Sequence, residues 1–241
     1  MESAEIKDKC VQWVREWFEK NGKGCSAVLG MSGGKDSTVA AAVCAEALGK
    51  DRVIGVSMPA EGQGENDADE ICKFLGIRYF CIPIGSILKE FEKTGGLLPQ
   101  SLSHQAEQNI PPRVRMTVLY AVSQSMNGRV VNTCNLSEDW IGYATRWGDS
   151  VGDFSPFGEL TVQEVKAIGH ALGVPSKWVE KIPDDGLPHS CSDEEKFGFT
   201  YEVLEKYIRT GVCEDEAIKE KIDRMHRNNL FKMSMPESFK L

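Results

Sequence analysis

The chain has 241 residues, of which 41% are hydrophobic, and its 28 basic and 36 acidic residues give a formal net charge of −8. This length is sufficient for one α/β domain with a substantial core, and the acidic balance argues against a general nucleic-acid or membrane binder. No apolar run approaches the roughly 20 residues of a membrane span, and the first residues do not form a signal peptide, so we expect a cytoplasmic protein.

Hydrophobic patterning predicts short buried strands that alternate with amphipathic helices. The first predicted helix, 4–19, carries Trp13, Trp17 and Phe18 on one side, which indicates core packing first and a subunit interface second. Further helices are predicted over 37–48, 67–75, 87–91, 113–126, 161–172, 175–182, 201–208 and 215–228, and strands over 25–29, 52–58, 79–82 and 129–133.

This alternation predicts the fold class. Strands that alternate with helices form a parallel sheet, and such sheets bind ligands at the carboxyl ends of their strands. We therefore expect an α/β fold, a Rossmann-like parallel sheet with flanking helices, in a single domain over 1–241. The glycine-rich stretch after the first strand would lie at such an end.

The polar stretch 94–108 has no clear periodicity, so we expect a mobile connection there. Pro111 and Pro112 end it and preset the first turn of the next helix. Arg113 and Arg115 follow at once. Arginines on a helix are often only a solvated face, but after a rigid proline turn a clamp for phosphate or carboxylate is the better explanation.

Two later segments have the composition of functional loops. Polar residues alternate with glycines and aromatics over 140–157, and a chain of this kind is costly to order unless it contacts something. The segment 183–192, which begins with Pro-Asp-Asp-Gly, is predicted to be a lid.

The eight cysteines form no C-x-x-C pair, and several lie within apolar runs. This distribution favours reduced, mostly buried thiols over a metal site or a disulfide framework. They are Cys10, Cys25, Cys44, Cys72, Cys81, Cys134, Cys191 and Cys213.

The chemistry is carried by the glycine loop 30–37, Gly-Met-Ser-Gly-Gly-Lys-Asp-Ser, which ends a strand and begins a helix. Backbone N–H groups at the positive end of a helix make a seat for phosphate oxygens. A Walker loop is excluded because Asp36 separates Lys35 from Ser37, and the glycines do not have the dinucleotide spacing. The remaining pattern, Ser-Gly-Gly-x-Asp-Ser, resembles the loop of the ATP pyrophosphatases, which cleave ATP between its α and β phosphates.

Further stretches, in chain order, together resemble NAD synthetase. These are Asn109–Tyr120 with its Arg-x-Arg, Thr133–Asp139, Gly142–Asp153, the Ser192-Asp193-Glu194 run before Phe197-Gly198, and a His-basic pair near the C-terminus. The resemblance implies an adenine-nucleotide hydrolase-like fold and the ammonia-dependent form, because a glutaminase domain has no room. It also implies the reaction: ATP activates the nicotinate carboxylate of deamido-NAD as an adenylate, pyrophosphate leaves, and ammonia displaces AMP to give NAD. The family is dimeric, so a homodimer is expected.

The resemblance also implies roles for individual residues. ATP, the co-substrate, would be bound by Gly30, Met31, Ser32, Gly33, Gly34, Lys35, Asp36, Ser37, Thr133 and Asp184. Mg²⁺ would be held by Asp36 and Glu138, and deamido-NAD by Arg113, Arg146, Asp153, His226 and Arg227. The catalytic residues would be Asp36, Asp149 and Asp193, the last two binding ammonium and taking its proton.

Several of these residues have a plainer structural interpretation. Asp36 would complement the positive end of a helix, Glu138 would be a solvated helix start, and Asp193 would cap a helix. A lone aspartate such as Asp149 often forms a turn, and His226 near a terminus is usually a surface group.

The chain departs from the family pattern at a few positions. Pro112 replaces an alanine, Arg227 a lysine, and Cys134 a glycine. Val162 replaces a lysine and Asp184 a serine or threonine, which changes the charge where the ATP phosphates are expected. The candidate compensating lysines are Lys35, Lys166, Lys177 and Lys181.

Two other readings of the loop stay open. One is a related pyrophosphate-loop enzyme that forms GMP or modifies tRNA, although the chain lacks the paired cysteines and basic surface common in thiolating members. The other is a nucleotide-binding regulator without catalysis, which would not need Glu138, Arg113 and Asp153 together.

Overall fold

The computed structural model describes residues 3–60, 67–96, 100–181 and 193–240. The predicted lid 183–192, with Asp184 and Cys191, therefore lies outside the described residues. The strands are β1 (Ser26–Gly30), β2 (Val53–Ser57), β3 (Arg78–Cys81) and β4 (Gly128–Val130). The helices are α1 (Ser3–Asn21), α2 (Lys35–Leu48), the 3-10 turn η1 (Lys50–Arg52), α3 (Ala68–Leu75), α4 (Gly85–Gly95), α5 (His104–Ser125), α6 (Leu136–Ile141), α7 (Val162–Ala171), α8 (Ser176–Val179), α9 (Asp193–Phe197), α10 (Tyr201–Thr210) and α11 (Glu216–Met233).

The four described strands form one parallel sheet in the order β3-β2-β1-β4. Val28 of β1 pairs with Ile54 of β2 on one side and with Val130 of β4 on the other. The predicted Rossmann-like α/β fold is thus confirmed. The chain moves outward from β1 to β3 and then returns to β4, so the strand order reverses between β1 and β4. In parallel sheets this reversal is where ligands bind.

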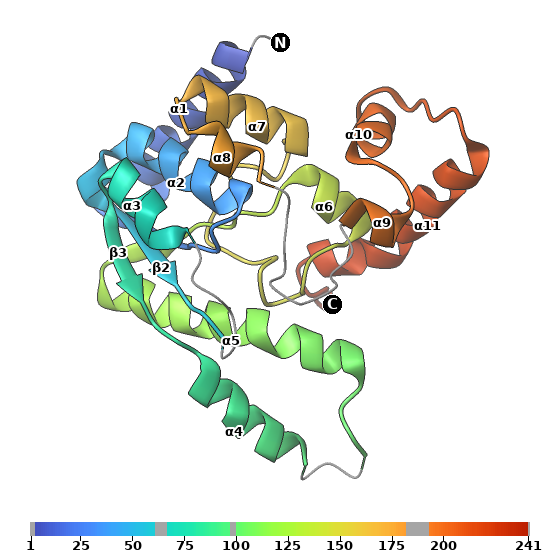
Figure 1. Ribbon diagram of the computed structural model, residues 1–241, viewed down its shortest axis with the longest axis horizontal. Helices are drawn as coiled ribbons and strands as arrows, with labels where there is room; N and C mark the ends of the chain where they lie inside the picture. Colours follow the sequence, from blue (N-terminus) through green and yellow to red (C-terminus); the bar gives the residue numbers. More distant parts are fainter. Residues whose placement is uncertain (1–2, 61–66, 97–99, 182–192, 241) are drawn as a thin grey trace.

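Side chains on alternate positions of the strands enter two different cores. Ala27 and Leu29 of β1 belong to a core shared with α1, α2 and α7. Val28 and Ile54 point to the opposite face and pack with Val114 and Leu119 of α5. Figure 1 shows the resulting layers, with α1, α2, α3, α7 and α8 above the sheet and α5 below it. Because both faces are covered, the central strands β1 and β2 are buried along almost their whole length, whereas the edge strand β3 is largely exposed.

The aromatic side of α1 packs into the core, as predicted. Trp17 stacks on Phe154 with ring centroids 4.6 Å apart, and Phe18 meets the same ring edge-on at 5.2 Å. Phe154 is brought there by a parallel bridge to Val131, just after β4. Trp13 remains largely exposed.

A third core joins α6, α10 and α11, seen at the right of Figure 1. Ile141, Leu204 and Ile222, one from each helix, are fully buried in it. Polar contacts tie this group to the rest, because Ser137 Oγ of α6 donates to the buried Glu205 of α10 (3.0 Å) and accepts from the Val162 backbone N–H of α7 (3.2 Å).

The connection predicted over 94–108 is wrong in part. Thr94 and Gly95 end α4, and α5 begins at His104, where Ser103 Oγ caps it by accepting from the Ala106 N–H (3.2 Å). Pro111 and Pro112 lie inside this helix and do not start it. Each proline removes one backbone N–H, but the serine cap starts the helix a full turn and more before them.

The predicted loop 140–157 also needs a small correction, since Trp140 and Ile141 end α6. The described cysteines carry no disulfide, which confirms the expected free thiols; Cys81 is exposed and Cys213 half-buried, and the others are buried. Burial raises the pKa of the Cys10 and Cys72 thiols to about 12, so these groups are unreactive.

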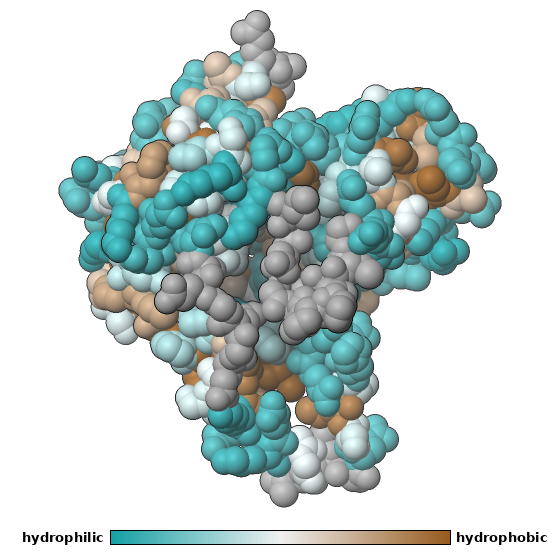
Figure 2. Space-filling view, viewed as in Figure 1, coloured by the Kyte–Doolittle hydropathy of each residue, from teal (hydrophilic) through white to brown (hydrophobic). Residues whose placement is uncertain are grey.

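No helix in the described parts of the chain is long and apolar enough to cross a membrane. On the face shown in Figure 2, hydrophilic residues cover most of the surface over α2, α3 and α8, whereas hydrophobic residues are exposed near α4 and on the α10–α11 side. Ile87 and Phe91 of α4 and Val212 after α10 are among the exposed large hydrophobic side chains.

The turn after α6 predicts a glycine requirement. Gly142 has φ +70°, and a Cβ there would lie 2.2 Å from Asn229 Cβ of α11. Gly211 has the same φ with open space around it and serves as the control. We expect Gly211→Ala to lower the free energy of unfolding by about 1–2 kcal/mol from backbone strain alone, and Gly142→Ala to lose roughly 1–3 kcal/mol more from the clash. Urea denaturation measures both; equal losses would contradict the packing against α11.

Candidate active site

The glycine loop leaves the first turn of α2 without a side-chain cap. Gly33 adopts φ +79°, and Gly34, the N-cap residue, offers no side chain to the N–H groups that follow. The Gly34 N–H donates to Ser32 Oγ (3.2 Å), and Ser37 Oγ donates back to the Gly34 carbonyl (3.1 Å), which fixes the turn. The loop therefore presents backbone N–H groups at a helix start, an arrangement that binds phosphate oxygens.

Lys35 turns into the protein instead of toward this loop. It is only 4% exposed, and its Nζ donates to Asp36 Oδ2 (2.8 Å) and lies 3.7 Å from Glu138 Oε1. Burial alone would lower the pKa of Lys35, but the charges of Asp36, Glu138 and Asp193 outweigh it and raise that pKa. The lysine is thus a charged link between α2 and α6.

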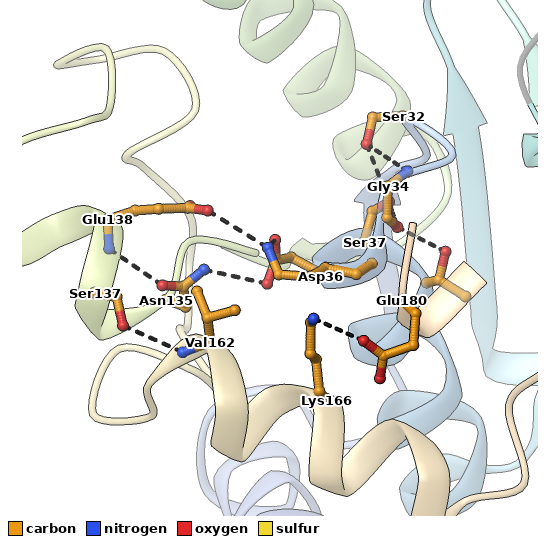
Figure 3. A network of polar contacts seen from close by, with 12 residues as sticks. Ser32, Gly34, Asp36, Ser37, Asn135, Ser137, Glu138, Val162, Lys166 and Glu180 are labelled. Carbon is orange, nitrogen blue, oxygen red and sulfur yellow. Dashed lines mark hydrogen bonds and ion pairs between the residues drawn. The ribbon is translucent and has the colours of Figure 1, made fainter. Parts of the chain in front are cut away.

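A second link runs through Asn135, which follows β4. Its amide donates to Asp36 Oδ1 (3.2 Å), while its carbonyl oxygen caps α6 by accepting from the Glu138 N–H (3.2 Å). Figure 3 shows Asn135 between the side chains of Asp36 and Glu138. The helices that follow β1 and β4 consequently begin beside each other, at the point where the strand order reverses.

These contacts concentrate negative charge. Burial, followed by repulsion from Asp36, raises the pKa of Glu138 to about 8, although Lys35 opposes the rise. No group of three or more candidate metal-ligating side chains occurs among the described residues. Mg²⁺, however, commonly binds one or two carboxylates together with substrate phosphates, so Asp36 and Glu138 fit such an ion.

Asp193 lies near this group and is itself buried. It starts α9, and its Oδ1 accepts from the Tyr143 hydroxyl (2.8 Å) and lies 3.6 Å from Lys196 Nζ. Its charge acts on both Lys35 and Glu138. Asp193 therefore contributes a third carboxylate to the same region.

Asp149 has a clear structural role. Its Oδ1 accepts from the Thr145 N–H (2.6 Å), and its carbonyl accepts from Cys134 Sγ (3.2 Å). Burial raises the pKa of Asp149, while hydrogen bonds from nearby backbone groups oppose this. Thr133, next to Cys134, is half-buried three residues after the end of β4, so the strand predicted over 129–133 is shorter than expected.

Two of the three arginines assigned to the dinucleotide, Arg113 and Arg146, lie next to each other. Arg113 Nε donates to the Arg146 carbonyl (3.2 Å), and Arg146 donates to the Ser234 carbonyl (3.2 Å). The Arg146 guanidinium also lies 5.0 Å from the Trp147 ring centre and 5.3 Å from that of Phe231. These contacts join the loop after α6 to the C-terminal end of α11.

Asp153 and His226 are occupied within the protein. The two carboxylate oxygens of Asp153 accept from the Val130 N–H (2.7 Å) and the Tyr120 hydroxyl (3.3 Å). The His226 ring stacks on Trp140 at 4.1 Å, with Nδ1 2.8 Å from the Trp140 carbonyl oxygen. Arg227 is exposed beside it.

A family model described as NAD synthase matches residues 6–241. The chain belongs to the NAD synthase family. A relative named NH(3)-dependent NAD(+) synthetase from Methanococcus aeolicus is 38% identical over 212 residues, which are 86% of this chain and 83% of the relative. The solved NMN synthetase from Francisella tularensis has a TM-score of 0.90 at 26% identity, and the NH3-dependent NAD synthetase from Campylobacter jejuni 0.79 at 29%; both alignments cover all of each chain. The resemblance found in the sequence is confirmed.

The family position occupied here by Val162 lies on α7, one turn before Lys166. Figure 3 shows both side chains on the side of α7 that faces Asp36. Lys166 donates to Glu180 (2.7 Å), which also contacts His170 (2.7 Å). Lys177 and Lys181 pair with Glu70 and Asp67 of the α3 region, respectively. Each candidate compensating lysine thus has a carboxylate partner.

Sequence reasoning missed three residues of the site in this NAD synthase fold. Asn135 had a usable signal, because Asn at a strand end with Glu three residues later resembles a helix cap. Tyr143 and Tyr201 had none, since nothing local shows that the Tyr143 hydroxyl donates to Asp193 or that the Tyr201 hydroxyl is buried. Tyr201 is buried with an unpartnered hydroxyl oxygen among the described residues, and its pKa is raised by burial and then by Glu138, Asp193 and Asp36.

The raised pKa of Glu138 predicts how its removal affects stability. Because the folded pKa, about 8, exceeds the usual 4.5, ionising Glu138 costs stability, and this cost grows as the pH rises from about 4.5 to above 8. We expect Glu138→Gln, in EDTA, to raise the melting temperature relative to the unsubstituted protein, by more at pH 8.5 than at pH 5.

Glu180→Gln is the control of opposite sign. Hydrogen bonds from Lys166 and His170 lower the pKa of Glu180, so its ionised form stabilises the fold and the substitution should slightly lower the melting temperature near neutral pH. A gain for Glu138→Gln that shrinks with rising pH would contradict the arrangement of charges around Lys35.

Proposed function

We propose that the residues grouped where the strand order reverses, beyond the ends of β1 and β4, carry out both halves of an amidation reaction. The chain is a C–N ligase of the ammonia-dependent type, which amidates deamido-NAD to NAD with ATP. One observation supports this site: the start of α2, which has no side-chain cap, lies beside the carboxylates of Asp36 and Glu138, and Lys35 contacts both. Neither half requires a covalent enzyme nucleophile, so positioning and charge neutralisation are the tasks of the protein.

In the first half, a nicotinate carboxylate oxygen attacks the α-phosphorus of ATP. The bond between that phosphorus and the bridging oxygen breaks, and pyrophosphate leaves with the electron pair. The N–H groups of the loop, over Ser32–Ser37, would hold the leaving pyrophosphate, with Gly30, Met31 and Thr133 beside the nucleotide. We also propose that Asp184, which stands where the family has a serine or threonine, contacts ATP.

Asp36 and Glu138 would hold Mg²⁺. When bound, the ion would neutralise charge that develops on the phosphate oxygens. Lys35 holds the two carboxylates near each other, which supports this assignment.

In the second half, the lone pair of ammonia attacks the adenylate carbonyl carbon. The C–N bond forms, the C–O bond to phosphate breaks, AMP leaves with that electron pair, and the new amide nitrogen loses one proton to solvent. The proton that ammonium must lose before attack would pass to Asp193. This carboxylate is buried, and its charge acts on Lys35. Asp149 is the weaker candidate, because its Oδ1 caps the Thr145 turn.

Deamido-NAD would be bound by Arg113, Arg146, Asp153, His226 and Arg227, and Arg146 and its neighbours join the loop after α6 to α11. A homodimer would complete this region. Exposed apolar side chains at the C-terminal end, such as Phe231 and the 88% exposed Phe239, support an interface there. Light scattering tests this directly, and a monomer at micromolar concentration would refute it. A cytoplasmic, single-domain enzyme that takes ammonia from solution is part of the same proposal.

Nicotinate mononucleotide is a second candidate acid. The Francisella tularensis structure with a TM-score of 0.90 is titled an NMN synthetase, against 0.79 for the Campylobacter jejuni NAD synthetase. Both acids present the same nicotinate carboxylate and differ in whether an adenylate half must also be held. Asp153 and His226, expected to contact the dinucleotide, already bond within the protein, which favours a smaller substrate.

A panel of acids separates the candidates. Purified protein is mixed with ATP, Mg²⁺ and deamido-NAD, nicotinate mononucleotide or xanthosine monophosphate, and AMP and pyrophosphate are measured with and without ammonium. We expect deamido-NAD to give the largest kcat/KM and NAD to form only with ammonium. A larger value for the mononucleotide would favour the second candidate, and turnover with xanthosine monophosphate alone would overturn both.

Asp36→Asn tests the first half of the reaction. The substitution removes a carboxylate from the phosphate loop while keeping the side-chain volume, so we expect AMP formation to fall by roughly a thousandfold with an unchanged far-UV circular dichroism spectrum. Asp69→Asn, on the exposed side of α3, is the control and should retain full activity. Normal turnover by Asp36→Asn would show that the metal binds elsewhere.

A further inference from the structure

Tyr201 carries a buried hydroxyl that the fold does not use. The residue starts α10, is 9% exposed, and its ring meets Phe197 edge-on at 6.2 Å. Its hydroxyl oxygen has no hydrogen-bond partner among the described residues. A buried hydroxyl without a partner costs stability, so its presence calls for an explanation such as a catalytic role or a bound ion or water.

The surroundings of this hydroxyl are negatively charged. After burial, the charges that raise the pKa of Tyr201 are those of Glu138, Asp193 and Asp36. The phenol therefore stays neutral at physiological pH, with one proton to donate and lone pairs to accept. An oxygen that accepts, placed among carboxylates, suits a cation that donates hydrogen bonds.

The groups near Tyr201 favour ammonium over Mg²⁺ as that cation. Asp193 already accepts from Tyr143, whose ring meets Phe197 edge-on at 4.9 Å, so carboxylate and aromatic groups line the same region as Tyr201. Ammonium is small, has four N–H donors, and is attracted by carboxylates and by aromatic faces alike. Mg²⁺ prefers charged oxygens and water to a neutral phenol.

We propose that the Tyr201 hydroxyl binds and orients ammonium, its oxygen accepting one N–H hydrogen bond while the Asp193 carboxylate accepts another. This inference rests on the proposed amidation. It adds a recognition group from α10 to a site otherwise built from α2, α6 and α9. It also explains why a polar oxygen is kept in the apolar group of Ile141, Phe197 and Leu204.

The test compares Tyr201→Phe with Tyr207→Phe, two isosteric changes on the same helix. The Tyr207 hydroxyl donates to Asp223 Oδ1 (2.7 Å) between α10 and α11, away from the carboxylates of the site. Three quantities are measured for each full-length variant: the KM for ammonium, the isotope exchange between pyrophosphate and ATP that depends on the acid substrate, and the melting temperature.

For Tyr201→Phe we expect the KM for ammonium to rise about tenfold to a hundredfold, as loss of a hydrogen bond to a charged group implies. The pyrophosphate exchange should stay within about twofold, because adenylation does not involve ammonium. The melting temperature should be unchanged or higher, since an unpartnered hydroxyl is removed. Tyr207→Phe should keep the KM and lose some stability.

An unchanged KM for ammonium in Tyr201→Phe would overturn the inference. So would an equal loss of pyrophosphate exchange, which would assign the hydroxyl to the adenylation half, or a large drop in melting temperature with all kinetic losses in proportion. Failure of the amidation itself is distinguishable, because the unsubstituted protein would then form no amide from any nicotinate acid and ammonium.

Discussion

A buried lysine between two carboxylates holds the site of this NAD synthase family member together. Lys35 is the residue that the loop motif places beside Asp36, and its contact with Glu138 brings together the helices that follow β1 and β4. A charge with so little exposure is tolerated only when it is paired. Without Lys35, the repulsion between Asp36 and Glu138 would be opposed only by the hydrogen bonds of Asn135 among the contacts described above.

The start of α6, which Lys35 contacts through Glu138, is also bonded to α10 and α7. Ser137, next to Glu138, connects Glu205 of α10 with the first turn of α7, so the start of α6 is bonded on both sides. Tyr201 lies one helical turn before Glu205 on the same side of α10. The position of α10 relative to the sheet is thus fixed through the helix that carries Glu138.

The sheet and the phosphate loop could be predicted because their signals are local. Buried strands give apolar runs, and the loop gives glycines at a strand-to-helix junction. The early start of α5 was missed because Pro111 and Pro112 outweighed a single serine cap at Ser103. The contact of Asn135 with Asp36 and the burial of Tyr201 depend on segments distant in sequence, and no local pattern encodes them.

The bare start of α2 has a consequence for the protein without ligands. Gly34 provides no side-chain acceptor for the N–H groups of the first turn, so the helix forgoes the additional stabilisation that a serine or aspartate cap would contribute over glycine, about a few tenths of a kcal/mol. A serine or aspartate side chain at position 34 would accept hydrogen bonds from the same N–H groups that are proposed to bind the phosphate. Thermal stability and nucleotide affinity therefore compete for the same backbone groups, and selection for one at position 34 acts against the other.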